Sequence, residues 1–323
     1  MAYSERDGLI DLFGGQDDLE KQIIRCVGNP VTRFEEDALR IMRGLRFAAT
    51  LGFTIESETA KAMHECRTLQ SKVAVERLLV EFKKLITGKN ASAILREFSD
   101  VIGVFIPEML ESVGFDQRSR HHCYDVYEHT LQVLDSCECD DLILRLGAYF
   151  HDIAKPRCFT LDEKGGHFYG HEKLGEEMTN EILRRLHADN VTRKKTAHLV
   201  SLHMKQLTPN EKTLRRFLAA EGEETVRRFI ALGRADRLAC APHNRDTSLY
   251  DALVSLLDEI LEKENCFALK DLAVHGDDLI RLGFSGKEIG QNLNALLSLV
   301  IDGTLENDKQ TLIEYIEKRK ATD

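Results

Sequence analysis

An adjacent histidine and aspartate, His151-Asp152, form the feature of this sequence that most directly suggests metal chemistry. The pair follows an apolar run in the segment Leu146-Gly-Ala-Tyr-Phe-His-Asp-Ile-Ala-Lys-Pro156. An imidazole and a carboxylate at the end of a helix can both reach one divalent ion, because neighbouring side chains there can point toward a common centre. One such pair is weak evidence, since any histidine-rich chain produces it by chance.

Four other histidines and aspartates stand in helical contexts around this pair. They are His129 in Val126-Tyr-Glu-His-Thr130, His171 in Gly170-His-Glu-Lys-Leu174, His203 at the end of Leu199-Val-Ser-Leu-His203, and Asp236 in Gly233-Arg-Ala-Asp-Arg-Leu238. For any one histidine, the plainer interpretation is a core or surface side chain that is satisfied by a neighbour. We keep that interpretation for the remaining histidines, which are His64, His121, His122, His167, His187, His198, His243 and His275.

The order of the six residues resembles that of the HD phosphohydrolases. The resemblance implies one metal at His129, His151, Asp152 and Asp236, a second supported by His171 and His203, and Lys155 near a phosphate. Mixed nitrogen and oxygen ligands suit Mn²⁺, Fe²⁺, Co²⁺, Ni²⁺ or Zn²⁺ better than Mg²⁺. Such a metal activates water near neutral pH and offsets phosphoryl charge. We therefore expect an enzyme, a metal-dependent phosphohydrolase in which His151, Asp152 and Lys155 are the catalytic residues.

Apolar residues recur at helical spacing along most of the chain, so the candidate ligands are expected on helices. One stripe contains Leu39, Met42, Leu45 and Ala49, and another contains Leu78, Leu79, Phe82, Leu85 and Ile86. Helix breaks are predicted near Gly52 and at 88–90. Further helices are predicted over 124–137, 141–150, 172–186 and 253–261 and within 269–302, with a turn-rich segment at 162–170. Because no long β alternation occurs, the predicted class is all-α.

A basic segment at residues 33–53 carries a second resemblance. It reads Arg33-Phe-Glu-Glu-Asp-Ala-Leu-Arg-Ile-Met-Arg-Gly-Leu-Arg-Phe-Ala-Ala-Thr-Leu-Gly-Phe53 and resembles the neck motif of tRNA nucleotidyltransferases and bacterial poly(A) polymerases. In that family an E-D-x-x-R segment reads the incoming base, which implies that Glu36, Asp37 and Arg40 bind the nucleotide here. On one helix Asp37 and Arg40 would project side by side, and together they could imitate a Watson–Crick edge for ATP or CTP. Arg43 would continue this basic ridge toward phosphates. The alternative is a solvated helix with a surface salt bridge.

The resemblance to the nucleotidyltransferases continues along the chain in the family's order. It implies a short remnant of an α/β head at 1–32, a helical neck at 33–112, an HD-type helical domain at 113–246 and a helical, tRNA-binding tail at 247–323. The implied role is tRNA processing, with CCA addition as the activity of the family. Expected partners are tRNA or another RNA 3′ end and the nucleotides ATP and CTP.

Nucleotidyl transfer in the resembled family needs a head domain with an Asp-x-Asp pair that holds two Mg²⁺ ions. No two aspartates of this sequence are spaced i, i+2. We therefore expect a chain without the catalytic head, which alone would not add nucleotides. It stays open whether the natural protein lost the head or the sequence is one part of a longer chain. The expected activity is hydrolysis of nucleotide or RNA phosphoesters, such as 2′,3′-cyclic phosphates. The alternative is a tRNA-binding scaffold with a catalytically silent HD domain.

Composition argues against a nucleic-acid-coating protein and against a membrane-spanning one. The net charge of −10 argues against a protein that coats nucleic acid through bulk charge, but it permits a local basic ridge that docks one RNA. No apolar stretch approaches the roughly 18 residues that span a bilayer, and the first residues do not resemble a signal peptide. The eight cysteines form no CxxC pair. Reduced, buried thiols, a cytoplasmic location and no membrane partner are the expectations, and the oligomeric state stays open.

Overall fold

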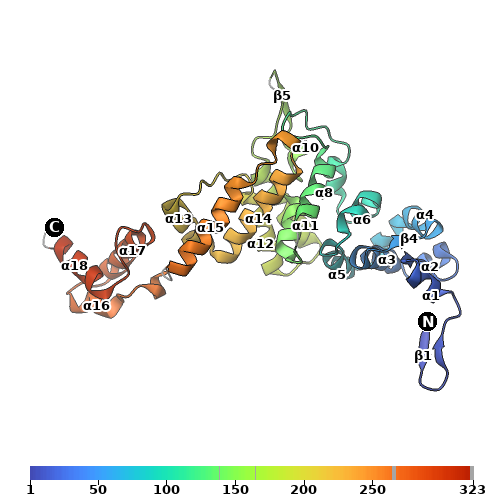
Figure 1. Cartoon of the computed structure of the whole chain (residues 1–323), viewed down its shortest axis with the longest axis horizontal. Helices are drawn as coiled ribbons and strands as arrows, with labels where there is room; N and C mark the ends of the chain where they lie inside the picture. Colours follow the sequence, from blue (N-terminus) through green and yellow to red (C-terminus); the bar gives the residue numbers. More distant parts are fainter. Residues whose placement is uncertain (138, 164, 264–266, 321–323) are drawn as a thin grey trace. The chain divides into compact units, whose positions relative to one another are not determined.

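The computed structural model describes residues 1–137, 139–163, 165–263 and 267–320 (Figure 1). Helices dominate these residues, and their strands form only three two-stranded sheets, which confirms the all-α class. The chain contains two compact units. Unit 1 is Met1–Met204 with Ala231–Asp246, and unit 2 is Lys205–Ile230 with Thr247–Asp323. The four functional segments expected above stay a prediction, because compactness does not assign a role to a segment.

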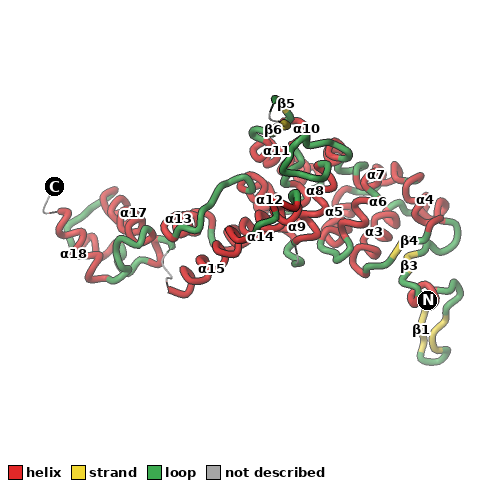
Figure 2. Tube along the Cα trace, turned by 45° about the horizontal axis from the view of Figure 1, so that its top comes forward, coloured by secondary structure: helices red, strands yellow, loops and turns green. Residues whose placement is uncertain are grey.

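The N-terminal half of unit 1 is mainly helical and contains two short sheets (Figure 2). Strands β1 and β2 pair antiparallel, and β3 pairs with β4 in parallel. Strands β3 and β4 contain only two residues each. The elements are β1 (Ala2–Ser4), β2 (Gly8–Ile10), α1 (Gly15–Glu20), β3 (Ile23–Ile24), α2 (Pro30–Glu36), α3 (Leu39–Leu51), β4 (Thr54–Ile55), α4 (Ser57–Glu65), the 3-10 helix η1 (Arg67–Lys72), α5 (Val75–Ile86), α6 (Ala91–Glu97), α7 (Ser99–Ile102) and the 3-10 helix η2 (Pro107–Ser112).

The two predicted apolar stripes are the buried faces of α3 and α5, which pack on each other. Helix α3 ends at Leu51 because Gly52 takes a left-handed conformation (φ 73°) that stops the helix, as the sequence predicted. The second predicted break, at 88–90, separates α5 from α6.

The C-terminal half of unit 1 is a group of helices with one hairpin. Aspartates begin three of the helices, because Asp125, Asp141 and Asp189 each accept a hydrogen bond from a backbone N–H of the first turn. Helix α11 packs on α12, α12 on α9, and α9 on α8. The elements are α8 (Val126–Ser136), α9 (Leu142–Phe150), α10 (Lys155–Cys158), β5 (Thr160–Asp162), β6 (Gly165–His167), α11 (His171–Arg185), α12 (Asn190–Leu202), the end of α14 (Glu223–Ala239) and the 3-10 helix η3 (Pro242–Asn244).

A buried arginine ties these helices to the first half of the unit. Arg145 of α9 donates to the carbonyls of Ile86 and Leu134 at 2.8 Å each, and also to those of Gly88 and Cys137. Its guanidinium satisfies the free carbonyls at the ends of α5 and α8, which would otherwise be costly to bury. The segments expected to be neck and HD domain therefore pack against each other within unit 1, through α5 and α9.

The turn-rich segment at 162–170 belongs to the β5–β6 hairpin, although residue 164 lies outside the described residues. The hairpin is fixed to the preceding loop, because Gly166 donates from its backbone N–H to the Arg118 carbonyl at 2.9 Å. A Cβ at Gly166 would overlap the carbonyl oxygen of Gln117, so this close approach requires glycine.

The described residues of unit 2 form helices joined by loops, with no strand among them. Its C-terminal part has a core of its own, formed by Leu272, Val274, Leu279, Leu296, Val300, Leu312 and Ile316. The predicted helix at 253–261 lies within α15. The elements are α13 (Glu211–Glu221), the start of α14, α15 (Ser248–Lys263), the 3-10 helix η4 (Leu269–Asp271), α16 (Gly276–Arg281), α17 (Lys287–Ile301) and α18 (Lys309–Lys320).

The structure also bears on membrane-spanning helices and on the burial of the cysteines. Within the described residues, no helix combines the length and the apolar character needed to cross a membrane. The seven described cysteines are free thiols, but only Cys66, Cys137 and Cys240 are buried, and Cys123 and Cys139 are exposed. The expectation of buried thiols is therefore correct for part of the set.

Candidate metal centre

The six predicted ligands come together in unit 1 from five helices. They are His129 in α8, His151 and Asp152 directly after α9, His171 as the first residue of α11, His203 directly after α12, and Asp236 in α14. Their donor atoms form two groups, in each of which the atoms lie within 4.8 Å of one another. The groups are His129, His151 and Asp236, and Asp152, His171 and His203.

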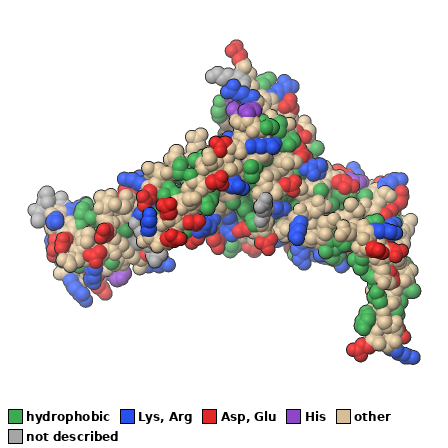
Figure 3. All heavy atoms as spheres, in the orientation of Figure 1, with side chains coloured by type: hydrophobic (Ala, Val, Ile, Leu, Met, Phe, Trp, Pro, Cys, Tyr) green, Lys and Arg blue, Asp and Glu red, His purple; other side chains and the backbone are tan. Residues whose placement is uncertain are grey.

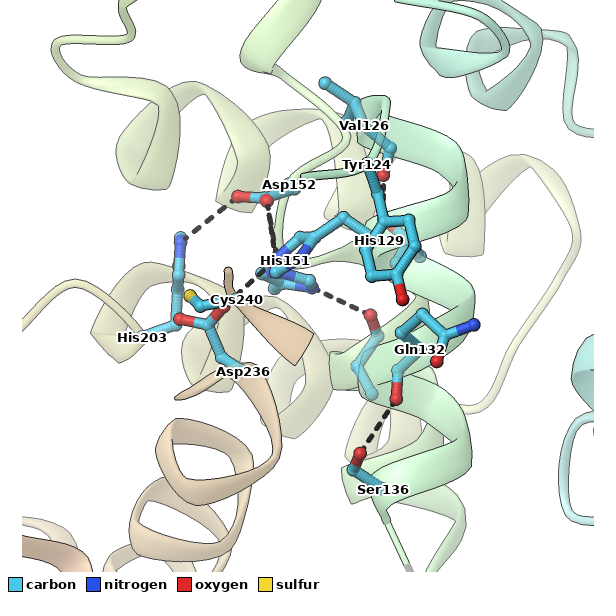
Figure 4. A network of polar contacts seen from close by, with 12 residues as sticks. Tyr124, Val126, His129, Gln132, Ser136, His151, Asp152, His203, Asp236 and Cys240 are labelled. Carbon is cyan, nitrogen blue, oxygen red and sulfur yellow. Dashed lines mark hydrogen bonds and ion pairs between the residues drawn. The ribbon is translucent and has the colours of Figure 1, made fainter. Parts of the chain in front are cut away.

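The carboxylate of Asp152 contacts a histidine of each group, His151 and His203 (Figure 4). Its Oδ2 is 3.2 Å from Nε2 of His151 and 3.5 Å from Nε2 of His129. Its Oδ1 is 3.3 Å from Nε2 of His171 and 3.7 Å from Nε2 of His203. One oxygen thus faces each group, which is the arrangement of a carboxylate that bridges two cations.

Three of the four histidines are oriented by the same backbone contact. Nδ1 of His151 lies 2.8 Å from the Ala148 carbonyl, Nδ1 of His171 lies 2.7 Å from the Phe168 carbonyl, and Nδ1 of His203 lies 2.6 Å from the Val200 carbonyl. Because a carbonyl only accepts, each Nδ1 carries the proton in a neutral ring. Each Nε2 then presents a lone pair to the centre, which is the usual state of a metal-binding histidine.

The Nε2 atoms of the four histidines are placed as ligands of a cation would be. Nε2 of His171 lies 3.0 Å from Nε2 of His203, and two lone pairs at this distance repel unless a proton or a metal lies between them. Nε2 of His129 and Nε2 of His151 are buried beside carboxylate oxygens, Oδ1 of Asp236 at 3.0 Å and Oδ2 of Asp152 at 3.2 Å. A nitrogen lone pair and a carboxylate at these distances are both satisfied by a divalent ion between them.

Charged groups around the centre favour the ionised carboxylates. Burial opposes the charge of Asp152, but the charges of His151 and Lys155 outweigh burial and hold the pKa of Asp152 well below its usual range. Burial likewise opposes the charge of Asp236, and the contact with His129 overcomes it and lowers the pKa of Asp236. Lys155 is buried, with Nζ 2.7 Å from Oδ2 of Asp152 and 2.9 Å from Oε1 of Gln117.

The centre opens into a pocket of about 510 Å³. Asp152, His171, His203 and Asp236 line it together with Lys155 and residues of the β5–β6 hairpin. Sequence reasoning missed three further histidines of its wall, which are His121, His122 and His167. The ring of His122 lies edge-on to His129, with 4.8 Å between centroids. Burial and the charge of Lys155 lower the pKa of His122 to about 3, so it is neutral at neutral pH.

The neck residues are arranged differently from the expectation. Asp37 and Arg40 do not share a helix, because α2 ends at Glu36, Asp37 is extended (φ −152°) and α3 begins at Leu39. Oδ1 of Asp37 accepts from the backbone N–H of Leu39, which explains the break. Arg40 pairs with Glu36 instead, at 2.8 Å.

A pocket of about 460 Å³ lies beside these neck residues. Arg40 and Arg43 line it together with Arg25 and Arg33, whereas Glu36 and Asp37 are not among its lining residues. Glu36 also accepts from Arg33 at 2.9 Å, and these arginine contacts lower its pKa. The neck therefore presents a cluster of arginines at a pocket, and a helix boundary separates Asp37 from Arg40.

Two families of known proteins match parts of this chain. Residues 52–108 match the family described as "Probable RNA and SrmB- binding site of polymerase A". Residues 120–261 match the HD domain family, and this range contains all six residues of the centre.

Curated relatives match almost the whole chain. An A-adding tRNA nucleotidyltransferase of Deinococcus radiodurans is 31% identical over 92% of this chain and 71% of its own length. A CCA-adding enzyme of Streptococcus sanguinis is 54% identical over 99% of this chain and 69% of its own length. The CCA-adding enzyme of Bacillus stearothermophilus, solved with CTP, has a similar fold, with a TM-score of 0.63 at 22% identity over 99% of this chain and 72% of that one.

Proposed function

This chain belongs to the family of A-adding and CCA-adding tRNA nucleotidyltransferases, and within that family we propose that its HD segment hydrolyses phosphoesters of nucleotides or RNA ends. The observation that carries the proposal is the Asp152 carboxylate, which has one oxygen toward each of two histidine-containing groups. Three histidines also support the proposal, because their Nδ1 atoms hydrogen-bond to backbone carbonyls and their Nε2 atoms remain available to a metal. They are His151, His171 and His203.

The residues of the centre have separate roles in this proposal. His129, His151, Asp152, His171, His203 and Asp236 would hold one or two divalent ions, with Mn²⁺, Fe²⁺, Co²⁺, Ni²⁺ and Zn²⁺ as the candidates for this donor set. Such an ion supplies a water nucleophile near neutral pH and offsets charge on the phosphoryl oxygens. Lys155, held by Gln117 at the wall of the pocket, adds a fixed positive charge for the phosphoryl group.

Replacement of Asp152 tests the proposal. We expect Asp152→Ala to abolish hydrolysis of 2′,3′-cyclic AMP and of bis(p-nitrophenyl) phosphate, because both groups lose the carboxylate they share. The assay uses purified protein supplied in turn with each candidate metal, and circular dichroism checks the fold. His187→Ala is the matched control, because His187 is 61% exposed and is not among the lining residues of the pocket. Full activity of Asp152→Ala with unchanged metal content would refute the assignment.

The alternative is a scaffold that binds tRNA through a catalytically silent HD domain. The matching RNA-binding family at 52–108 and the tRNA-acting relatives are compatible with it. The two interpretations differ in one measurement. A silent domain leaves 2′,3′-cyclic AMP intact with every metal tested, while the chain still binds tRNA.

A second candidate function belongs to the neck. The four arginines at the neck pocket favour a role in holding ATP or CTP during nucleotide addition to tRNA, which the names of the relatives describe for them. In this proposal Arg40 and Arg43 contact the nucleotide, and Glu36 orients Arg40. The comparisons do not support the expectation that the protein lacks a head domain. The Asp-x-Asp pair that would hold Mg²⁺ is nevertheless absent from the 323 residues of this sequence.

A further inference from the structure

Two stacked rings lie on the wall of the pocket that contains the metal centre. His167 and Tyr169 have ring centroids 5.3 Å apart and planes inclined by only 8°. Tyr169 is 78% exposed, so the outer face of the pair is open to a further ring. Histidine side chains are visible at the surface beside the β5–β6 hairpin in Figure 3. The roles assigned to the metal centre do not use either ring.

Contacts on the inner side hold this pair in place. Nε2 of His167 lies 2.9 Å from Oδ1 of Asp162 across the hairpin. The Tyr169 hydroxyl lies 3.4 Å from Nδ1 of His167. The hairpin is itself bonded to the 117–118 loop through Gly166. A platform that is already ordered loses little conformational freedom when a ligand binds.

The same pocket offers two kinds of surface to one ligand. One part is the metal centre with Lys155, which favours an anionic phosphate, and Arg237 adds a cation to the lining. The other part is the flat face of Tyr169. A pocket of about 510 Å³ is within the usual size range for a small-molecule site. A ligand that uses both surfaces needs a phosphate and a planar ring, and a nucleotide has both.

We propose that His167 and Tyr169 form a stacking platform for the base of a nucleotide or of a terminal RNA residue whose phosphate lies at the metal centre. The placement of the phosphate rests on the proposed hydrolase function, whereas the stacking does not require hydrolysis. Since every base has a π face, the platform selects nucleotides over sugar phosphates without reading the base.

The absence of tryptophan from this sequence permits a direct binding test. Tyr169→Trp introduces a single tryptophan at the platform, and stacking of a base on its indole quenches the fluorescence. We expect saturable quenching by adenosine 5′-monophosphate and by uridine 5′-monophosphate, read within seconds of mixing. Ribose 5-phosphate at equal concentrations should leave the signal unchanged. Equal responses to the sugar phosphate and the nucleotides, or no response to any of them, would overturn the platform.

Kinetics provide the second test. For the wild type we expect kcat/KM to be about 5- to 150-fold higher for adenosine 5′-monophosphate than for ribose 5-phosphate. This is the range that one base–aromatic stack provides. Tyr169→Ala should bring this ratio close to one, and Tyr169→Phe should restore it because the ring is retained. Leu161→Ala is the matched control, since Leu161 is an exposed residue of the same hairpin that is not among the lining residues of the pocket. A ratio that Tyr169→Ala leaves intact would contradict the proposal.

The two tests separate this inference from the function on which it rests. If nucleotides quench the fluorescence but no phosphoester is hydrolysed, the proposed hydrolase function is wrong and the stacking platform stands. If phosphoesters are hydrolysed without quenching, and Tyr169→Ala leaves the ratio of kcat/KM for nucleotide over ribose 5-phosphate unchanged, the hydrolase function stands and the stacking platform is wrong.

Discussion

Asp152 is the residue on which both groups of the metal centre depend. Its Oδ2 lies within 4 Å of His129 and His151, and its Oδ1 lies within 4 Å of His171 and His203. The charges of His151 and Lys155 favour its ionised form against burial. His171 and His203 face only its Oδ1, whereas His129 and Asp236 face each other at 3.0 Å in the other group. The two groups can therefore be tested one at a time.

The number of metal ions tests the second group. We expect purified wild type to hold close to two transition-metal ions per chain by elemental analysis and His203→Ala close to one, because the other group keeps its own ligands. His187→Ala should retain the wild-type number. If the wild type and His203→Ala both hold one ion, His171 and His203 are contacts to substrate phosphate and the two-ion interpretation is wrong.

Residue types and their order were enough to propose the six ligands, because a metal site demands specific donors. Orientation could not be predicted, since the carbonyls of Ala148, Phe168 and Val200 contact the rings only after the backbone is placed. His122 was missed because it lies in the loop before α8, where no element was predicted to direct its side chain toward the centre. Only the expectation of one continuous helix through Asp37 and Arg40 was wrong, since a short carboxylate that accepts from a nearby N–H can end one helix and begin the next.

At the scale of elements, α12 matters because it ends at a residue of the centre. His203 follows its last turn, and Asp189 begins its first turn by accepting from the backbone N–H of Thr192 at 2.8 Å. Asp189 also lies 3.0 Å from Nζ of Lys83. Because the Asp189 side chain is 57% exposed, the attraction to Lys83 is screened and the capping bond is the larger contribution.

We expect Asp189→Ala to lower the free energy of unfolding by about 0.5–2 kcal/mol, the usual cost of a lost helix cap. Asp189→Asn should lose much less, because asparagine also caps. The backbone and side-chain hydrogen bonds from Thr192 lower the folded-state pKa of Asp189 below its ordinary value of 3.8. The contribution of its charge is therefore complete above that value and is lost as the pH falls below it.

Urea denaturation between about pH 6 and about pH 3 measures both effects. The stability difference between wild type and Asp189→Asn should shrink as the pH approaches the lower limit. A difference that stays constant over this range would show that the charge of Asp189 contributes nothing, and a stability of Asp189→Ala equal to that of wild type would show that the cap is dispensable.

The helices themselves were largely predictable. Apolar periodicity and glycine breaks predicted α3, α5, α8, α9, α11 and α15 to within a few residues. The β3–β4 pairing was not predictable, because two-residue strands such as Ile23–Ile24 and Thr54–Ile55 leave no alternation to detect and depend on a partner distant in the sequence.

At the scale of the whole molecule, the first 204 residues and the segment 231–246 form one unit, and this division was not evident from the sequence. Helix α14 begins in unit 2 and ends in unit 1, where it supplies Asp236. Helical periodicity continues across such a boundary, because it reports which face is buried and not which unit covers it. The order of neck, HD and tail motifs was the stronger guide to the family.

The last prediction concerns nucleotide addition by the chain as a whole. The 323 residues contain no Asp-x-Asp pair, so we expect them alone to incorporate no labelled CMP or AMP into tRNA that lacks its 3′ terminus. Joining the chain to a head domain that supplies this pair should permit addition. If the arginines of the neck pocket hold the nucleotide, Arg40→Ala in the joined protein should then lower kcat/KM by at least about tenfold, because a hydrogen bond to a charged group contributes about 1.5–3 kcal/mol.

Arg77→Ala is the matched control for this experiment, because Arg77 is an exposed arginine of α5 that is not among the lining residues of the neck pocket. Arg40 also pairs with Glu36 and donates to the Arg33 carbonyl, so a general loss of stability has to be separated from a loss of nucleotide binding. A change in the ratio of CMP to AMP incorporation makes that separation, since unfolding lowers both equally. Robust addition by the 323 residues alone would refute the first expectation, and an unchanged ratio and rate in Arg40→Ala would leave its contact with Glu36 as an ordinary surface ion pair.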